Sequence, residues 1–262
     1  SATGRSAWMR LFDETSAALR FPFKKKSLTE AEILNLLSDP DPETRKIAGK
    51  SLSEVLENNK RIFGMILNVI SRDRFIEDNK RGFKRIMSSR NLDNDVEDEV
   101  VDKLVDTIDK AMPKLTHRYY KWKANQFGQT RLDWWDRNAP LPHSSENLIK
   151  WSDAKDIILD SFSSFHPEIS NLAVLFFKNN WIDASLRKGK ASGAFAHPSV
   201  PSLHPYILVN YQGKIRDVMT LAHELGHGVH QILAGKNGLL MAETPLTLAE
   251  TASVFGEMLV FR

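Results

Sequence analysis

The sequence predicts a mainly α-helical protein, in which a helical N-terminal lobe precedes a core with a small β-sheet and a helix that carries a His-Glu-x-x-His motif. Three observations support this fold class. Apolar residues recur with a period near 3.6 through most of residues 1–125, β-rich residues follow at 206–211, and residues 220–231 then hold three histidines in a helical pattern. A chain of 262 residues is long enough for one or two domains with a real core.

The N-terminal lobe is predicted to be a succession of helices. Thr29 or Ser27 can cap the first of them, and Asp41 can cap the next because Pro42 suits a first helical turn. Pro113 should end or kink the helix before it, because proline cannot continue the hydrogen-bond ladder. The apolar residues that define these helices are Ile33, Leu34, Leu37, Ile62, Phe63, Ile66, Val69, Ile70, Val96, Val100, Val101, Leu104, Val105, Ile108 and Met112.

A change in composition indicates a domain boundary near residue 125. Residues 125–146 combine glycine, proline and aromatic residues without clear periodicity, which is typical of a connecting segment. Helical patterns resume over 147–180, and residues 189–214 are predicted to form two short strands joined by a loop. We therefore expect one domain over 1–125 and a second over 126–262.

Charge and composition exclude several classes of partner. Lys and Arg number 36 against 33 Asp and Glu, a net charge of +3, which gives no basis for a nucleic-acid surface. No apolar stretch approaches the roughly 18 residues of a membrane helix, so no membrane association is expected. The absence of cysteine excludes disulfides and thiolate ligands and fits a reducing compartment, and we expect a cytoplasmic protein.

The histidines of "TLAHELGHGVHQ" have the spacing of a metal site. Residues 215–234 suit a helix with Gly235 as a natural stop, and His223 and His227 at i and i+4 can reach one ion from the same side. Glu224 flanks that ion, where a carboxylate can take a proton from metal-bound water. The alternative is an ordinary amphipathic helix whose histidines are satisfied elsewhere.

Two glycines favour the metal site over the amphipathic helix. Gly226 and Gly228 lie mid-helix, where each costs about 1 kcal/mol relative to alanine. Such a cost suggests close packing against another backbone. The β-rich segment just upstream also supplies the sheet that zinc-peptidase sites of this type need.

Three possibilities compete for the third ligand: His230, a final histidine in the extended pattern His-x-x-Gly-x-x-His, and an acidic residue after the helix. His230 lies on the same face but about 4.5 Å further along the helix than His227, so it would have to lean back a full turn. Glu250, on the following helix, is the preferred ligand, although Thr247-x-x-Glu250 also fits a capping box. Glu243, in the loop, is the weaker acidic alternative.

Two further features bear on this helix pair. Glu257 falls seven residues after Glu250 on the same face, as an acceptor for a ligand histidine. The extended pattern His-x-x-Gly-x-x-His fails after His227, because His230 occupies the glycine position and Leu233 the last histidine position.

At this point the sequence resembles a known family. "TLAHELGHGVHQ" followed by "LAETASVFGEMLVF" resembles the oligoendopeptidase F branch of the thimet-oligopeptidase family of zinc metallopeptidases. The segments "DWWDRNAPL", "FHPEI…WIDA", "GKASGAF" and "PYILVNYQG" stand in the order and spacing of that family, and "LTEAEILNLLSDPDPETRKIA" resembles its helical N-terminal domain. The resemblance therefore covers essentially the whole chain.

The resemblance implies a two-lobed helical endopeptidase with a zincin-type catalytic core over 126–262 and a channel that admits short unstructured peptides. It implies one zinc ion held by His223, His227 and Glu250. Glu224 would be the general base on zinc-bound water and would return the proton to the leaving amine. Gly193-Ala194-Phe195 would be the sheet edge that pairs with the substrate backbone.

The sequence departs from the family at its end. Arg262 falls twelve residues after Glu250, whereas family members continue for well over a hundred residues that supply tyrosine and histidine donors to the oxyanion. We therefore expect a truncated relative or a fragment that binds zinc weakly, cleaves poorly, and self-associates through its apolar end. The rivals to a peptidase are a zinc hydrolase of another substrate class and a non-catalytic helical peptide-binding module.

Overall fold

The computed structural model describes residues 3–142 and 147–261. The structure is mainly helical with a few short strands, which confirms the predicted fold class. Contacts between residues divide the chain into two compact units, one of residues 1–144 with 187–191 and the other of residues 145–186 with 192–262. The division into domains at 125 and 126 stays a prediction.

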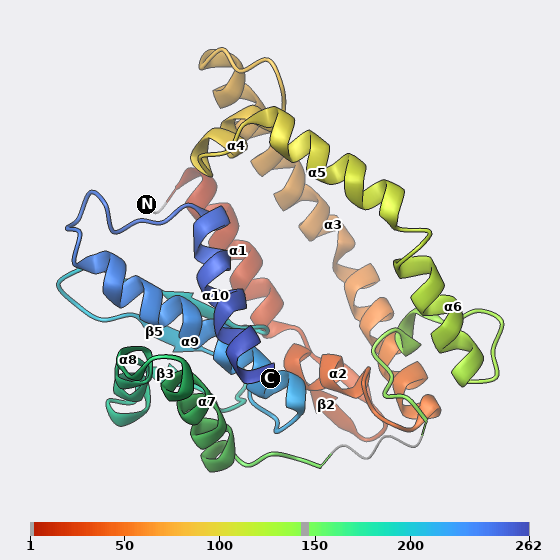
Figure 1. Ribbon diagram of the computed structural model, residues 1–262. Helices are drawn as coiled ribbons and strands as arrows, with labels where there is room; N and C mark the ends of the chain where they lie inside the picture. Colours follow the sequence, from red (N-terminus) through yellow and green to blue (C-terminus); the bar gives the residue numbers. More distant parts are fainter. Residues whose placement is uncertain (1–2, 143–146, 262) are drawn as a thin grey trace. The chain divides into compact units, whose positions relative to one another are not determined.

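The first unit is built mostly from helices (Figure 1). A two-stranded antiparallel hairpin, β1 and β2, follows the first helix. Its elements are α1 (Gly4–Ala18), β1 (Phe21–Phe23), β2 (Lys26–Leu28), α2 (Glu30–Leu36), α3 (Pro42–Lys80), α4 (Ser88–Asp93), α5 (Asp98–Ala111), α6 (Thr116–Gln126) and the 3₁₀ turn η1 (Trp134–Asp136).

Local capping signals explain where two of these helices begin. Thr29 caps α2 through a capping box, in which its hydroxyl accepts from the backbone N–H of Glu32 and the Glu32 carboxylate accepts from the backbone N–H of Thr29. Asp41 caps α3 by accepting from the backbone N–H groups of Glu43 and Thr44. These start signals confirm the sequence predictions, with Thr29 as the cap rather than Ser27.

Other boundaries in the first unit differ from the predicted ones. The helix that begins after Asp41 continues through the apolar residues at 62–70 as one 39-residue helix, α3, because no proline interrupts it after Pro42. The hairpin β1–β2 was not predicted, since three-residue strands carry too little pattern to be seen in sequence. Helix α5 ends at Ala111, just before Pro113, as expected.

The first unit packs around one small core. Phe21 and Ile33 are fully buried there, and the hairpin, α2 and the start of α3 all contribute. Because residue 49 is glycine, the Trp135 side chain can pack directly on the backbone of α3. A Cβ at Gly49 would lie 2.9 Å from the Trp135 Cβ. Beside this contact, the buried Arg45 guanidinium pairs with Asp136 at 2.7 Å.

The second unit combines helices with a three-stranded sheet. Strands follow the order β3-β5-β4, with β3 parallel and β4 antiparallel to the central β5. Its elements are α7 (Trp151–Phe165), α8 (Pro167–Lys178), β3 (Ile182–Asp183), β4 (Phe195–His197), β5 (Tyr206–Leu208), α9 (Ile215–Gly235) and α10 (Leu246–Phe261).

The two strands predicted within 189–214 are confirmed as β4 and β5. The parallel strand β3 was missed, because its two residues carry no alternation and its partner lies about 25 residues away along the chain. The helical pattern over 147–180 resolves into two helices, separated at His166, whose side chain caps α8 ahead of Pro167.

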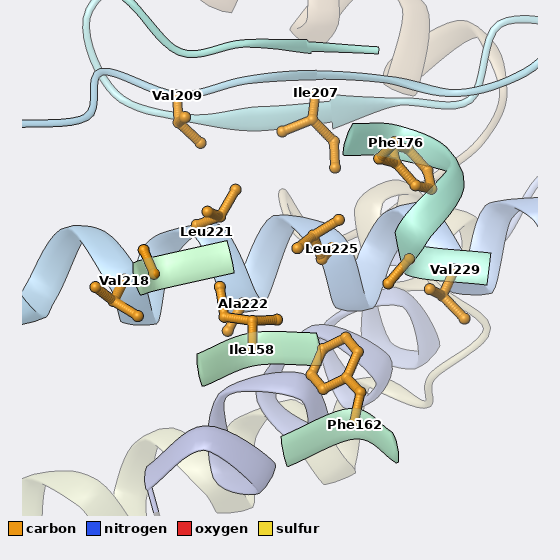
Figure 2. Close-up of a cluster of buried hydrophobic side chains, with 12 residues drawn as sticks. Ile158, Phe162, Phe176, Ile207, Val209, Val218, Leu221, Ala222, Leu225 and Val229 are labelled. Carbon is orange, nitrogen blue, oxygen red and sulfur yellow. The ribbon is translucent and has the colours of Figure 1, made fainter. Parts of the chain in front are cut away.

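The core of the second unit surrounds α9 (Figure 2). On one side of the helix, Leu221 and Leu225 point toward Ile207 of the sheet. On the other side, Ala222 faces Ile158 of α7. Apolar burial on both sides therefore fixes α9 in position and leaves the histidine-bearing face for another neighbour.

Within the described part of the chain, the helices are too short or too polar for any of them to cross a membrane.

Candidate metal centre

Helix α10 packs against the histidine-bearing α9 through glycines on both helices. A Cβ at Gly226 would lie 2.7 Å from the carbonyl oxygen of Ala252 and 2.9 Å from the Cα of Ser253. A Cβ at Gly256 would lie 2.7 Å from the carbonyl oxygen of Ala222. Only glycine allows these two backbones to approach so closely, and the approach brings the side chains of α10 to the His-Glu-x-x-His motif.

The prediction about the two motif glycines is therefore half confirmed. Gly226 does pack against another backbone, that of α10. Gly228 does not, because its nearest neighbours are the ring of Phe176 and the side chain of Ile207, with the ring 2.6 Å from an added Cβ. The sequence shows that space is needed at both positions but not what fills it.

The side chains of His223, His227 and Glu250 converge on one point. One ligand atom from each of them lies within 4.8 Å of the others, so this group could hold a metal ion. The Nε2 atom of His223 is 3.4 Å from Glu250 Oε2, and the Nε2 atom of His227 is 3.7 Å from Glu250 Oε1. Each histidine thus faces a different oxygen of the same carboxylate.

These separations are comparable with those in a metal site. Two ligand atoms at about 2.0–2.1 Å from a tetrahedral ion such as zinc lie roughly 3.3 Å apart. The two histidine–carboxylate distances of 3.4 and 3.7 Å are near that value and involve different oxygens of Glu250. The donor set of two imidazoles and one carboxylate also leaves one position open, as catalytic zinc sites do.

Helix α10 also makes other contacts with the two histidines. The Nδ1 atom of His223 lies 2.5 Å from Oε1 of Glu257, which fixes the ring and directs Nε2 toward Glu250. The ring of His227 forms a hydrogen bond with the backbone of Ala249. The sequence identified Glu257 from its spacing alone, whereas the backbone contact has no sequence signal.

Glu224 occupies an unusual environment for a carboxylate. Only 5% of the residue is exposed, and its Oε2 atom is buried without a hydrogen-bond partner among the described residues. Burial raises the pKa of Glu224 to about 7, His223 opposes that rise, and Glu250 and Glu257 add to it. A carboxylate with a pKa near neutrality can exchange protons at physiological pH.

Burial also lowers the pKa of His227, and the neighbouring His223 and His230 act in the same direction. The Glu250 carboxylate opposes this decrease. A lowered pKa keeps the imidazole neutral, which is the form that binds a metal ion.

The other candidate ligands do not join this group. Among the described residues, the set of converging ligand atoms includes neither His230 nor Glu243. His230 lies on α9 beyond His227, as the helix rise predicts. Glu243 lies in the exposed loop between the two helices.

The predicted substrate segment lies beside β4, at an edge of the sheet. Phe195 is the first residue of β4, and Gly193 and Ala194 directly precede it. Since β5 is the only described strand that pairs with β4, the other side of β4 has no strand partner in the described part of the chain. The carbonyl oxygen of Gly193 accepts from Asn210, and Gln231 of α9 donates to the carbonyl oxygen of Ala196.

The fold and the site define a mainly α-helical protein with a candidate metal centre on paired helices. Comparison with known proteins gives the family. Residues 35–262 match the family model described as Peptidase family M3, and the chain therefore belongs to this family of peptidases.

Two curated relatives illustrate the match. The chain is 27% identical over 238 residues to Oligopeptidase PepF of Bacillus subtilis (strain 168), covering 90% of this chain and 35% of that protein. It is 29% identical over 251 residues to an oligoendopeptidase F homolog of Borreliella burgdorferi, covering 94% of this chain and 42% of that protein. These names confirm the resemblance to oligoendopeptidase F.

Solved structures share the fold. A crystal structure titled as an oligoendopeptidase F from Bacillus anthracis str. Ames has a TM-score of 0.85 at 18% identity, covering 98% of this chain and 48% of that one. A structure titled PZ peptidase A with inhibitor 2 has a TM-score of 0.89 at 18% identity, covering 98% of this chain and 47% of that one.

The chain spans less than half the length of the curated relatives named here. The expectations about truncation, weak zinc binding and poor cleavage therefore stay predictions. So does self-association through the apolar end. Met258 and Phe261 of that end are exposed, with 52% and 76% of their surface accessible, while Arg262 lies outside the described residues.

Proposed function

We propose that this chain carries the zinc-binding and proton-transfer residues of an endopeptidase that hydrolyses short unstructured peptides. His223, His227 and Glu250 would hold one zinc ion, and Glu224 would be the general base. The convergence of the three ligand atoms within 4.8 Å, with a buried carboxylate beside them, is the observation that carries the proposal.

The residues present fit a zinc ion. Without a cation, Glu250 and Glu257 place two acidic side chains against His223, and the buried Oε2 of Glu224 has no partner in the described residues. Positive charge at the centre of this group would offset the repulsion among the carboxylates. The donor set of two imidazoles and a carboxylate is one that zinc favours.

Glu224 supplies the proton chemistry of this proposal. When bound, zinc lowers the pKa of a water molecule and polarises a carbonyl group. The Glu224 carboxylate accepts a proton from the attacking water and then donates it to the nitrogen of the leaving amine. A positive charge nearby would lower the pKa of Glu224 from its value of about 7, which keeps the carboxylate ionised and ready to act as the base.

The sheet edge supports a peptide as the substrate. A substrate backbone can pair with the open side of β4 through main-chain hydrogen bonds. Such hydrogen bonds bind an extended peptide whatever its side chains are. Residues 193–195 are the proposed pairing segment, and Gln231 connects the neighbouring β4 residue Ala196 to the helix that carries His227. This open edge favours a peptidase over a zinc hydrolase of another substrate class.

Metal analysis with two histidine variants tests the ligand set. Protein equilibrated with excess zinc should bind one ion per chain, measured by atomic emission alongside intact mass. His227→Ala should lose the zinc, because two remaining ligands hold the ion far less tightly. His230→Ala is the matched control on the same helix and should keep it.

Loss of zinc in His230→Ala together with retention of zinc in Glu250→Ala would show that the ligand set is wrong.

A cleavage assay with a quenched peptide tests the reaction. Cleavage should stop when a chelator removes the metal and should return when zinc is added. Location in the cytoplasm stays part of the proposal.

A further inference from the structure

Ser253 is a buried polar residue next to the candidate metal centre. It lies on α10 one helical turn after Glu250 and has no exposed surface. A Cβ at Gly226 would also lie 2.9 Å from the Cα of Ser253, so Ser253 lies in the close contact between α10 and α9. A hydroxyl in such a position needs a hydrogen-bond partner inside the protein.

The partner is the Glu250 carboxylate. Ser253 Oγ lies 2.9 Å from Glu250 Oε2 and 3.0 Å from the backbone oxygen of Glu250. A hydroxyl has one proton to donate, and a helix carbonyl already accepts from the N–H group four residues later. The carboxylate oxygen is therefore the preferred acceptor for the Ser253 hydroxyl. A hydrogen bond to this charged oxygen is stronger than one to the neutral backbone oxygen.

This hydrogen bond acts on the ligand that is least confined. The Glu250 side chain is 46% exposed, against 23% for His223 and 14% for His227. A glutamate with that freedom has several rotamers, and confining it to one costs conformational entropy. The oxygen that Ser253 holds is the one that lies 3.4 Å from His223 Nε2.

With Ser253 included, each of the three candidate ligands has a supporting contact from α10. His223 contacts Glu257, His227 contacts the backbone of Ala249, and Glu250 contacts Ser253. We infer that Ser253 is a positioning residue that holds the Glu250 carboxylate in the geometry of a metal ligand. This inference rests on the proposed zinc site.

Zinc affinity of variants on α10 tests the inference. Ser253→Ala removes one oxygen and should lower the affinity for Zn²⁺ by about 10–100-fold, the usual effect of losing a group that orients a metal ligand. The measurement is competition with a chromogenic chelator. The matched control is Thr251→Ala, whose hydroxyl donates to the backbone oxygen of Thr247, and it should leave the affinity unchanged.

A double-mutant cycle separates positioning from general packing. In a Glu250→Ala background, Ser253→Ala should cause no further loss of Zn²⁺ affinity, because the carboxylate it orients is gone. The Co²⁺ absorption spectrum should change in Ser253→Ala and stay constant in Thr251→Ala. Equal losses in both backgrounds, or no loss in either, would overturn the inference.

The two proposals fail in different ways. If His227→Ala binds Zn²⁺ as tightly as the unchanged protein, the zinc site itself is wrong. If His227→Ala loses Zn²⁺ while Ser253→Ala does not, only the role of Ser253 is wrong. Loss of the folded circular dichroism spectrum in metal-free Ser253→Ala would make Ser253 a structural residue and would likewise overturn its positioning role.

Discussion

Glu224 differs from an ordinary surface carboxylate in two ways. It is buried beside the three converging candidate ligands, and in the absence of a metal ion burial raises its pKa to about 7, a value that a bound cation would lower. The sequence indicates its position, because it directly follows His223. Its burial and its unpartnered oxygen come from the packing of α10 and the core around α9.

Glu224→Gln should separate metal binding from catalysis. The amide has nearly the same shape but cannot accept the proton of water, so in a version extended to the length of the curated relatives the rate of peptide cleavage should fall by about 10²–10⁴-fold. Zinc content and the circular dichroism spectrum should stay unchanged. Glu54→Gln, at an exposed position on α3, is the control and should leave the rate as it was. Near-normal turnover in Glu224→Gln would exclude the mechanism.

At the scale of single residues, the sequence indicated which residue types belong to the candidate site and how they are spaced, but indicated less well which side chains each of them contacts. His223 and His227 were paired by their i, i+4 spacing, and the structure brings their Nε2 atoms to one carboxylate. The choice of Glu250 over Glu243 depended on where the next helix would begin. Ser253 was not found at all, because no local pattern shows that its hydroxyl faces the Glu250 carboxylate.

At the scale of elements, the contact between α9 and α10 determines whether the candidate centre forms. Two helices normally pack 8–10 Å apart, and glycines at the contact permit a closer approach. Gly226 and Gly256 serve this purpose from opposite helices. The third candidate ligand, Glu250, and Ser253, which contacts it, both belong to α10, so a shift of that helix would move them together.

Gly226→Ala should therefore disturb both stability and metal binding. Its Cβ would meet the backbone of Ala252 and Ser253, neither of which can rotate away, so the free energy of unfolding should fall by about 1–3 kcal/mol. Zinc affinity should fall as well, because α10 carries Glu250. Denaturant unfolding and chelator competition measure the two effects.

The control for Gly226→Ala is another helical glycine. Gly64 of α3 has nothing within 4 Å of an added Cβ, so Gly64→Ala should stabilise the protein by about 0.5–1 kcal/mol through helix propensity. If both substitutions have the same sign, close packing of α9 on α10 is not what requires Gly226.

A buried ion pair connects two elements of the first unit. Arg45 of α3 and Asp136 of η1 are 1% and 3% exposed, and the Arg45 guanidinium also donates to the backbone oxygens of Asp39 and Pro40. Asp136→Ala leaves a buried positive charge without its partner, and the free energy of unfolding should fall by about 3–5 kcal/mol.

Urea unfolding of Asp136→Ala measures this loss. The exposed pair of Arg10 and Glu14 provides the comparison, since both side chains face solvent, and Glu14→Ala should cause no measurable change. A small effect of Asp136→Ala would mean that water reaches the Arg45 guanidinium.

At the scale of the whole molecule, the candidate centre belongs to one unit. Its ligands come from α9 and α10, and the core that supports α9 comes from α7, α8 and the sheet, all of which lie in the second unit. A ligand stabilises only the structure that binds it, and at 100 times its dissociation constant it adds about 2.7 kcal/mol.

Hydrogen exchange with and without zinc should therefore distinguish the two units. Zinc at 100 times its dissociation constant should slow the exchange of backbone amides in α9 and α10 by up to about 100-fold. This rate ratio corresponds to the stabilisation of about 2.7 kcal/mol. Amides of α2 and the β1–β2 hairpin should exchange at the same rate in both samples. Equal protection in both regions would contradict a metal site confined to the second unit.

The sequence by itself determined the features that depend on neighbours along the chain. Helical periodicity, the caps Thr29 and Asp41, the stop near Pro113 and the i, i+4 histidine pair all act within one or two turns, so a local pattern records them. The family resemblance is likewise carried by short segments in a fixed order.

The tertiary structure alone decided the features that join distant segments. The parallel pairing of β3 with β5, the backbone contact at Gly226, the buried pair of Arg45 with Asp136, and the hydroxyl of Ser253 each depend on partners that packing brings together. An apolar pattern predicts that one face of a helix or strand is buried. It does not predict which other element packs against that face, because the hydrophobic effect is non-directional. The third candidate ligand could therefore be proposed from the sequence, but only the approach of two helices at their glycines brings it to the histidines.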